Sequence, residues 1–257
     1  MKSINRPKPK SHKGENGRML VIAGSEKFHG ALILAVQAAS RVVDVIYIYS
    51  TEENCELIKK MKSQIASFIT VMDGELWETA KKADAILIGP GLAEVQENVD
   101  LTRDMLKKYP KKKTVIDATA LWHLKPEWLH SNCILTPHRL EFENVFKCDA
   151  TPENVEKMAA KYDVTIVLTG YVDFISNGKE NWQNKTGNAG MTKGGTGDIL
   201  AGLITAFAST NHPLPSALAG AFLNGYVGDK LHSEVGTFYN SEDLSKAVGR
   251  VWRNGCC

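Results

Sequence analysis

Short, almost uninterrupted apolar runs alternate with longer helical patterns along the first two thirds of the chain. Parallel strands buried on both faces have such continuous apolar runs instead of alternating apolar and polar residues. Their alternation with helices predicts an α/β three-layer sandwich, in which helices cover both faces of a mostly parallel sheet. The expected strands are 18–24, 45–49, 68–72, 85–91, 114–118, 133–137 and 165–170, and the expected helices are 30–43, 53–64, 76–82, 95–108, 140–147 and 152–162.

The last third of the chain has a different pattern. Asn177-Gly178 lies between two short runs and predicts the turn of a β-hairpin. After the hairpin only helices are expected, at 198–209, 215–233 and 241–252. Because we find no internal repeat or linker, residues 13–257 are expected to form one domain, preceded by a basic, flexible tail at 1–12.

Composition and charge limit the classes of function. The 257 residues are 43% hydrophobic and 23% charged, as in an ordinary globular protein, and the net charge of +2 is too small to indicate a nucleic-acid or membrane-surface partner. We find no apolar run typical of a signal peptide or membrane span, so we expect a cytoplasmic protein with a small-molecule partner. The odd number and spacing of the cysteines favour reduced thiols over disulfides or a zinc site. They are Cys55, Cys133, Cys148, Cys256 and Cys257.

The segment "GNAGMTKGGTGDILAG", residues 187–202, is rich in glycine and ends in an apolar run. Glycines at 194, 195 and 197 allow the backbone to approach a ligand closely, and the run 199–208 predicts a buried helix that starts at the same point. This combination predicts an anion site. Asp198 at the helix start is either an N-cap or a general base that takes the proton of a hydroxyl attacking a phosphoryl group. Neither G-x-x-x-x-G-K-[ST] nor a complete G-x-G-x-x-G is present.

Polar or turn-forming residues occur at the carboxyl ends of four of the expected strands. They occur in "GPGL", "DATAL", "TPHRLE" and the "TG" at 169–170. Each segment alone is consistent with an ordinary turn, since Gly, Pro, Asp and Thr favour turns for backbone reasons. Ligands of open α/β sheets bind beyond the carboxyl ends of the strands. Four polar segments in this topological position therefore predict one ligand crevice.

Six segments in order give the chain a family resemblance. At Gly195-Thr196-Gly197-Asp198 it resembles the ribokinase-like superfamily, whose phosphate loop and base read G-x-G-D. Nearly the whole chain is similar to the ADP/ATP-dependent NAD(P)H-hydrate dehydratases. The segments are "KGENGRMLVIAGSEKFHGALILA", "IGPGL", "VIDATAL", "LTPHRLEF", "GNAGMTKGGTGDILAG" and "AGAFLNGYVGD".

This resemblance implies an enzyme that repairs nicotinamide cofactor hydrated at C6 of its reduced ring. ADP or ATP, with Mg²⁺, phosphorylates the ring hydroxyl of the S-epimer, and phosphate then leaves to regenerate NADH or NADPH. A carbon–oxygen lyase and a homo-oligomer are implied. Two alternatives remain open at this point. One is a ribokinase-like kinase of a sugar or vitamin alcohol, and the other is a non-catalytic nucleotide-binding sensor.

The resemblance also implies roles for individual residues. Ala31, Gly91 and His138 match contacts to the hydrate, and Asp198 matches the base that removes the hydroxyl proton. Glu141 stands at the glutamate of the N-x-x-E motif of many related kinases and helps to organise Mg²⁺ indirectly. Local alternatives are a loop hydrogen-bonder for His138 and a first-turn helix acid for Glu141. The implied nucleotide and phosphate contacts are Thr169, Gly170, Asp173, Lys193, Gly194, Gly195, Thr196 and Gly197.

Two of these positions depart from the family pattern. Many members have lysine-glycine followed by a threonine where this chain has Thr169-Gly170 and Asp173, so a cation is missing. Lys193 stands just before the glycine loop, where neutral residues are usual. The hypothesis is that Lys193 replaces the missing charge beside the phosphates, and the alternative is that it is a solvated loop lysine.

Overall fold

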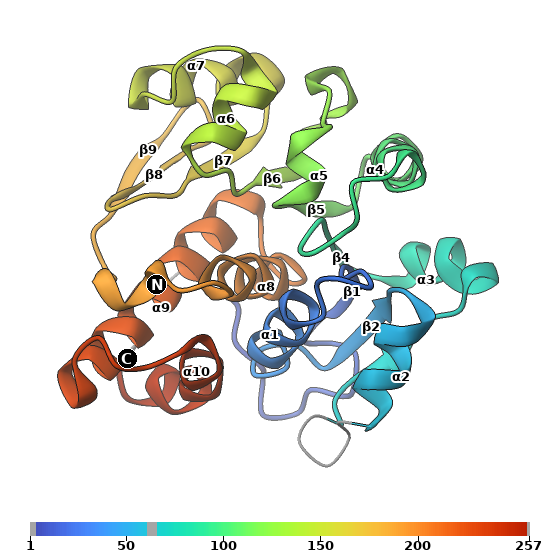
Figure 1. Ribbon diagram of the computed structural model, residues 1–257, viewed down its shortest axis with the longest axis horizontal. Helices are drawn as coiled ribbons and strands as arrows, with labels where there is room; N and C mark the ends of the chain where they lie inside the picture. Colours follow the sequence, from blue (N-terminus) through green and yellow to red (C-terminus); the bar gives the residue numbers. More distant parts are fainter. Residues whose placement is uncertain (1–3, 61–65, 256–257) are drawn as a thin grey trace.

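The computed structural model describes residues 4–60 and 66–255 (Figure 1). The end of the expected helix 53–64, the first three residues of the expected tail, Cys256 and Cys257 lie outside these residues. In the described chain, a single nine-stranded sheet has the order β3-β2-β1-β4-β5-β6-β7-β8-β9. The strands are β1 Arg18–Ile22, β2 Val45–Tyr49, β3 Ile69–Thr70, β4 Ala85–Ile88, β5 Lys113–Ile116, β6 Cys133–Leu135, β7 Thr165–Leu168, β8 Asp173–Ser176 and β9 Asn181–Asn184.

The strands from β1 to β7 pair in parallel, and β8 and β9 pair antiparallel beyond them. This confirms the mostly parallel sheet. The hairpin between β8 and β9 turns at Asn177 and Gly178, as expected. Gly178 has φ +79°, and a Cβ there would lie 2.3 Å from the Ala160 backbone, so this turn requires glycine.

Helices occur in each expected interval, with ends that shift by a few residues. They are α1 Gly30–Ala39, α2 Glu52–Lys60, α3 Leu76–Lys82, α4 Gln96–Lys108, α6 Arg139–Phe146, α7 Pro152–Tyr162, α8 Thr196–Ala208, α9 Pro213–Val235 and α10 Ser241–Gly255. A four-residue helix, α5 Thr119–Trp122, and the 3₁₀ turns η2 Asp73–Glu75, η3 Pro126–Trp128 and η4 Ala189–Thr192 were not predicted. Several strands are shorter than their apolar runs. The run 85–91 stops being a strand at Ile88, because Gly89 and Gly91 adopt φ of +127° and +64°.

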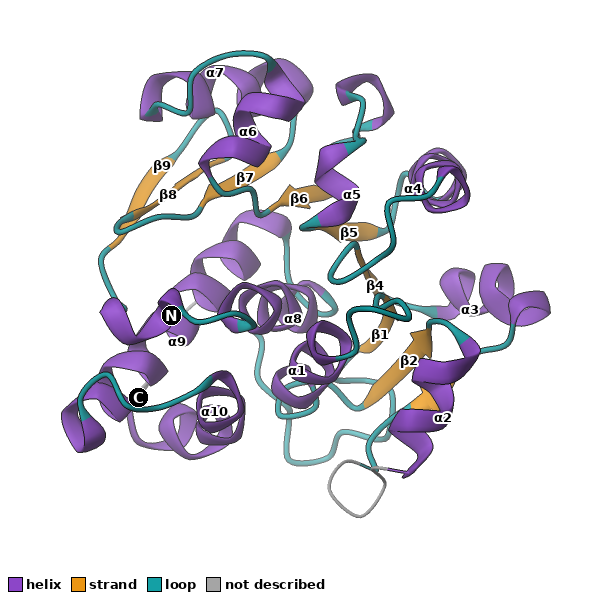
Figure 2. Cartoon of the chain, viewed as in Figure 1, coloured by secondary structure: helices purple, strands orange, loops and turns teal. Residues whose placement is uncertain are grey.

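Alternate residues of each central strand face two separate cores. Met19 and Val21 of β1 pack with side chains of α1, α8 and α9, whereas Leu20 and Ile22 pack with those of α3 to α7. Figure 2 shows the sheet between these two groups of helices, with α10 outside α1 and α9. The arrangement confirms the three-layer α/β sandwich. Among the described residues, no helix combines the length and the apolar character that crossing a bilayer requires.

Helix α8 lies very close to its two neighbours. A Cβ at Gly202 would lie 2.6 Å from the carbonyl oxygen of Ala35 in α1, and a Cβ at Gly220 of α9 would lie 2.4 Å from the Ile204 side chain of α8. Only glycine permits such approach of one helix to the next. The two contacts determine where the start of α8 stands at the carboxyl edge of the sheet.

The N-terminal segment contacts the opposite end of α8. Ile4 is buried with α8, α9 and α10, and the Asn5 backbone N–H donates to Asn211 Oδ1 at 2.8 Å. The Asn5 side chain also donates to the carbonyl of Thr210 at 2.6 Å. Residues 4 and 5 therefore pack against the body of the protein, while the division into a flexible tail at 1–12 and a domain at 13–257 stays a prediction.

Candidate active site

The loops at the carboxyl ends of neighbouring strands are joined by hydrogen bonds. They follow β1, β4, β5, β6 and β7. Such links make a continuous, rigid rim where the sequence predicts a ligand crevice. The bonds run from Gly24 N to Pro90 O (2.8 Å), from Thr119 Oγ1 to Leu92 O (3.0 Å), from Thr136 Oγ1 to Asp117 Oδ1 (2.7 Å) and from Thr169 N to Pro137 O (3.0 Å).

Two of the expected substrate residues, Ala31 and Gly91, lie together on this rim. Gly91 has φ +64°, and a Cβ built on it would lie 3.0 Å from the Cβ atoms of Ala31 and Phe28 and 3.1 Å from the Phe28 carbonyl oxygen. The bare backbone of the β4–α4 loop therefore packs directly on the turn between β1 and α1. A side chain at position 91 would compete with that contact.

Asp198 is the third residue of α8. The N-cap is Gly195, which adopts φ +98° and provides no side-chain hydrogen bond to the helix, so the N-cap interpretation of Asp198 is wrong. Burial raises the pKa of the Asp198 carboxyl to about 6. A carboxylate with such a pKa, beside first-turn amides that have no acceptor within the helix, suits a general base at an anion site.

Asp117, at the end of β5, is a further acidic residue that the sequence analysis did not single out. Its side chain is buried and accepts a hydrogen bond from the Thr136 hydroxyl. Burial raises the pKa of Asp117 well above its usual value, and the negative charges of Asp198 and Glu141 raise it further. An acid directly after a buried apolar strand was the available signal. These three acidic side chains therefore form one cluster at the rim, in which the charge on one carboxyl opposes ionisation of another.

His138 and Glu141 cap the start of α6 reciprocally. His138 Nδ1 accepts from the backbone N–H groups of Leu140 (3.1 Å) and Glu141 (3.3 Å), and Glu141 Oε2 accepts from His138 N at 2.9 Å. Both local alternatives, a loop hydrogen-bonder and a first-turn acid, are therefore confirmed. Because Nδ1 is an acceptor, the neutral ring carries its proton on Nε2, which lies 3.5 Å from Glu141 Oε1. The half-exposed ring can still donate to a ligand.

The expected nucleotide residues after β7 hold a tight turn. The backbone N–H of Gly170 donates to Asp173 Oδ1 at 3.1 Å, and Asn184 Nδ2 donates to Asp173 Oδ2 at 2.9 Å. Burial raises the pKa of Asp173, although these two hydrogen bonds lower it. Thr169 also donates from its hydroxyl to the Pro137 carbonyl at 3.3 Å, which places it beside the loop that carries His138.

Lys193 precedes the glycine loop, but its ammonium group has other contacts. Nζ donates to the carbonyl of Thr237 at 2.6 Å and to that of Gly190 at 3.3 Å, and it lies 5.2 Å from the centre of the Tyr239 ring. The charge is thus held beside the segment between α9 and α10. Its replacement of the missing cation at Thr169 stays a hypothesis, and it would require release of these carbonyls.

The sheet order, the glycine loop at the start of α8 and the partly buried carboxylate beside it define a ribokinase-like α/β protein. Within this class, the family model for NAD(P)H-hydrate dehydratase matches residues 19–250. The chain belongs to this family, and the resemblance found in the six segments is confirmed.

Named relatives support this membership. The chain is 38% identical over 258 residues to the bifunctional NAD(P)H-hydrate repair enzyme Nnr of Methanocaldococcus jannaschii. The aligned region covers 98% of this chain and 51% of that protein. It is 33% identical to the ADP-dependent (S)-NAD(P)H-hydrate dehydratase of Nitrosopumilus maritimus, covering 98% and 94% of the two chains. The chain therefore spans about half the length of the bifunctional relative and nearly the full length of the other.

A solved structure of a relative has a similar fold. The ADP/ATP-dependent NAD(P)H-hydrate dehydratase from Bacillus subtilis, co-crystallised with ATP/Mg²⁺, matches with a TM-score of 0.81 at 28% identity. The match covers 96% of this chain and 93% of the Bacillus chain. The similarity thus includes both the sheet and the helical last third.

Proposed function

We propose that the protein dehydrates the S-epimer of hydrated NADH or NADPH with ADP or ATP as phosphoryl donor. The observation that carries the proposal is Asp198, a partly buried carboxyl beside the glycine loop on the rim that also holds Gly91 and His138. A base next to an anion site suits phosphorylation of a hydroxyl. The names of the relatives identify the hydroxyl compound as an NAD(P)H hydrate.

In the proposed reaction, residues on the two sides of the rim have different roles. Asp198 takes the proton of the C6 hydroxyl while the oxygen attacks the terminal phosphoryl group. The bond between that phosphorus and its bridging oxygen breaks, and AMP leaves from ADP, or ADP from ATP. The amides of residues 194–197 and the start of α8 stabilise the charge that develops on the phosphoryl oxygens. The C6–O bond then breaks, phosphate leaves with the bonding electrons, and C5 releases a proton, which regenerates the reduced nicotinamide ring. The Gly91 loop and His138 hold that ring in place.

Mg²⁺ fits this site as a companion of the nucleotide. The described residues contain no group of three or more His, Cys, Asp or Glu side chains that could hold a metal ion. Mg²⁺ commonly uses only one or two carboxylates and completes its shell with phosphate oxygens and water. Glu141 and Asp117 are the buried carboxyls available for this, and the bound ion would neutralise phosphate charge.

The pH dependence of kcat/KM tests the role of Asp198. The base must be ionised, and its pKa is about 6, so kcat/KM should fall about tenfold for each pH unit below about 6. Initial rates at low hydrate concentration across this range, with circular dichroism to verify folding, would measure the decline. A level profile down to about pH 5 would argue against Asp198 as the base.

The activity itself can be assayed with S-epimeric hydrated NADH, Mg²⁺ and either ADP or ATP. A dehydratase restores the near-ultraviolet absorbance of the reduced ring and releases inorganic phosphate in equal amounts. A kinase of a sugar or vitamin alcohol would leave the hydrate unchanged and would accumulate a stable phosphorylated product only from its own substrate, and a sensor would bind nucleotide without turnover. A cytoplasmic location, expected from the sequence, and a homo-oligomeric state, implied by the family resemblance, belong to the same proposal.

A further inference from the structure

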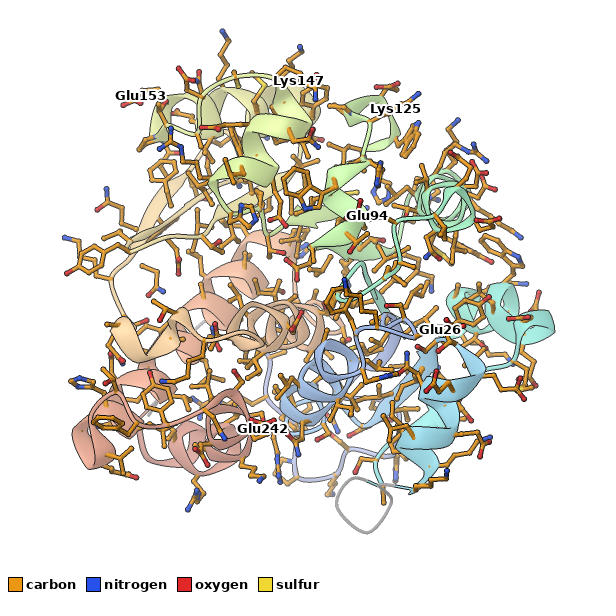
Figure 3. All side chains as sticks on the ribbon, in the orientation of Figure 1. Glu26, Glu94, Lys125, Lys147, Glu153 and Glu242 are labelled. Carbon is orange, nitrogen blue, oxygen red and sulfur yellow. The ribbon has the colours of Figure 1, made fainter. Side chains whose placement is uncertain are left out.

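His29 is a half-buried histidine on the rim that has no role in the proposed reaction so far. It lies in the turn between β1 and α1, two residues before Ala31, whose Cβ faces Gly91. Figure 1 shows this turn between the start of α2 and the loop after β4, and Figure 3 marks the two loops with Glu26 and Glu94. His29 therefore belongs to the wall that holds the expected substrate residues.

The side chain of Asn54, in α2, holds the His29 ring in one orientation. Asn54 is only 1% exposed, and its Nδ2 donates to the carbonyl of Ser25 at 3.2 Å and to Ser50 Oγ at 3.0 Å. A backbone carbonyl can only accept a hydrogen bond, so the Asn54 amide cannot be reversed. Its Oδ1 oxygen is therefore the atom that lies 2.6 Å from His29 Nδ1.

This contact determines the tautomer of the ring. A carboxamide oxygen only accepts, so His29 Nδ1 must carry a hydrogen. In the neutral ring the lone pair then lies on Nε2, which has no hydrogen-bond partner within residues 4–60 and 66–255. His138 has the reverse arrangement, with its hydrogen on Nε2. The rim thus presents one histidine as an acceptor and another as a donor.

We propose that His29 contacts the substrate and accepts, through Nε2, a hydrogen bond from an N–H or O–H group of the NAD(P)H hydrate. The inference rests on the proposed function. The hydrate carries such donors in its carboxamide and its hydroxyl groups. A fully buried amide that orients a half-buried histidine is the arrangement seen where a ring must present one nitrogen to a ligand. The competing explanation is that His29 only joins the β1–α1 turn to α2.

Nuclear magnetic resonance of protein labelled with ¹⁵N-histidine tests the tautomer without any assay of activity. When the ring is neutral, the His29 signals should show a protonated Nδ1 and an unprotonated Nε2. The His29→Asn spectrum, which lacks these signals, assigns them. A neutral His29 ring with its hydrogen on Nε2 would overturn the proposal.

His29→Asn separates contact with the substrate from support of the turn. The Asn amide nitrogen can take the place of Nδ1 and keep the bond to Asn54, but nothing replaces Nε2. We expect the KM for the hydrate to rise roughly three- to tenfold, as for one lost hydrogen bond. The KM for the nucleotide and the melting temperature should stay unchanged, and His29→Gln, which places a polar atom near the Nε2 position, should restore part of the loss.

His232→Ala serves as the matched control, because His232 is an exposed histidine in the last turn of α9. It should change neither KM. An unchanged KM for the hydrate in His29→Asn would overturn the proposal and leave His29 as a link between the turn and α2. If the wild-type protein itself fails to dehydrate the hydrate, the proposed function fails and this inference fails with it. An inactive wild-type protein thus refutes the proposed function, whereas an active wild-type protein with an unchanged KM in His29→Asn refutes only the role of His29, so the two failures are distinguishable.

Discussion

Asp198→Asn is expected to lower turnover by about two to four decades, the usual loss when a general base is removed. The Asn side chain keeps the shape of the carboxyl group but cannot take the hydroxyl proton. Nucleotide affinity should change little, because the glycine loop and the start of α8 remain intact. Single-turnover rates and calorimetric titration of ADP or ATP would measure the two quantities.

The same variant is expected to be more stable than the wild type at neutral pH. The pKa of Asp198 is raised from 3.8 to about 6 in the folded protein, so above about pH 6 the partly buried carboxylate destabilises the fold, and this cost disappears as the pH falls below 3.8. Removing the charge should raise the free energy of unfolding by about 1 to 3 kcal/mol. Chemical denaturation at neutral and acidic pH would measure this gain.

Glu242→Gln provides a control, since Glu242 is an exposed carboxylate in the first turn of α10 (Figure 3). It should alter neither turnover nor stability appreciably. If Asp198→Asn retains more than about a tenth of the wild-type rate, another group removes the proton. A loss of stability in that variant would instead mean that the carboxylate supports the start of α8.

Gly91→Val is expected to raise the KM for the hydrate by roughly 5- to 150-fold. Gly91 adopts φ +64°, and any Cβ there meets Ala31 and Phe28 at 3.0 Å. A β-branched residue in this conformation costs about 1 to 3 kcal/mol, and the loop can relieve that strain only by moving away from the β1–α1 turn. Steady-state kinetics with hydrate and nucleotide varied separately would show a change confined to the hydrate.

Gly74→Val is the matched control for this substitution. Gly74 lies in η2, its φ is not in the left-handed region, and no heavy atom lies within 4 Å of a Cβ built there. It should leave both KM values unchanged. If Gly91→Val bound the hydrate as well as the wild type does, the β4–α4 loop would not belong to the substrate site.

Much of the fold could be predicted because burial on both faces leaves a strong signal in the sequence. The run "AILI" of β4 is apolar throughout, since Ile86 and Ile88 face one core while Ala85 and Leu87 face the other. The exact end of that strand could not be predicted, because it depends on the positive φ of Gly89 beside the Asp117 backbone. Glycine permits that conformation but does not by itself indicate it.

The candidate site likewise has parts that could be predicted from the sequence and parts that could not. The glycine loop and Asp198 are close together in the sequence, so their combination could be interpreted directly. Asn54 and His29 are 25 residues apart, and only the pairing of β1 with β2 brings them together. The contacts of Lys193 with the carbonyls of Gly190 and Thr237 likewise depend on where the segment after α9 lies.

The close approach of α8 to α1 and α9 has a consequence for how the protein folds. The contact between Gly202 and Ala35 joins residues far apart in the chain, and such non-local contacts form slowly because a long loop must close first. The glycine loop gains its position only when α8 enters between its neighbours. Nucleotide binding should therefore develop late in refolding, once α8 has packed against α1 and α9, and a nascent chain that ends before α9 would lack a working phosphate site.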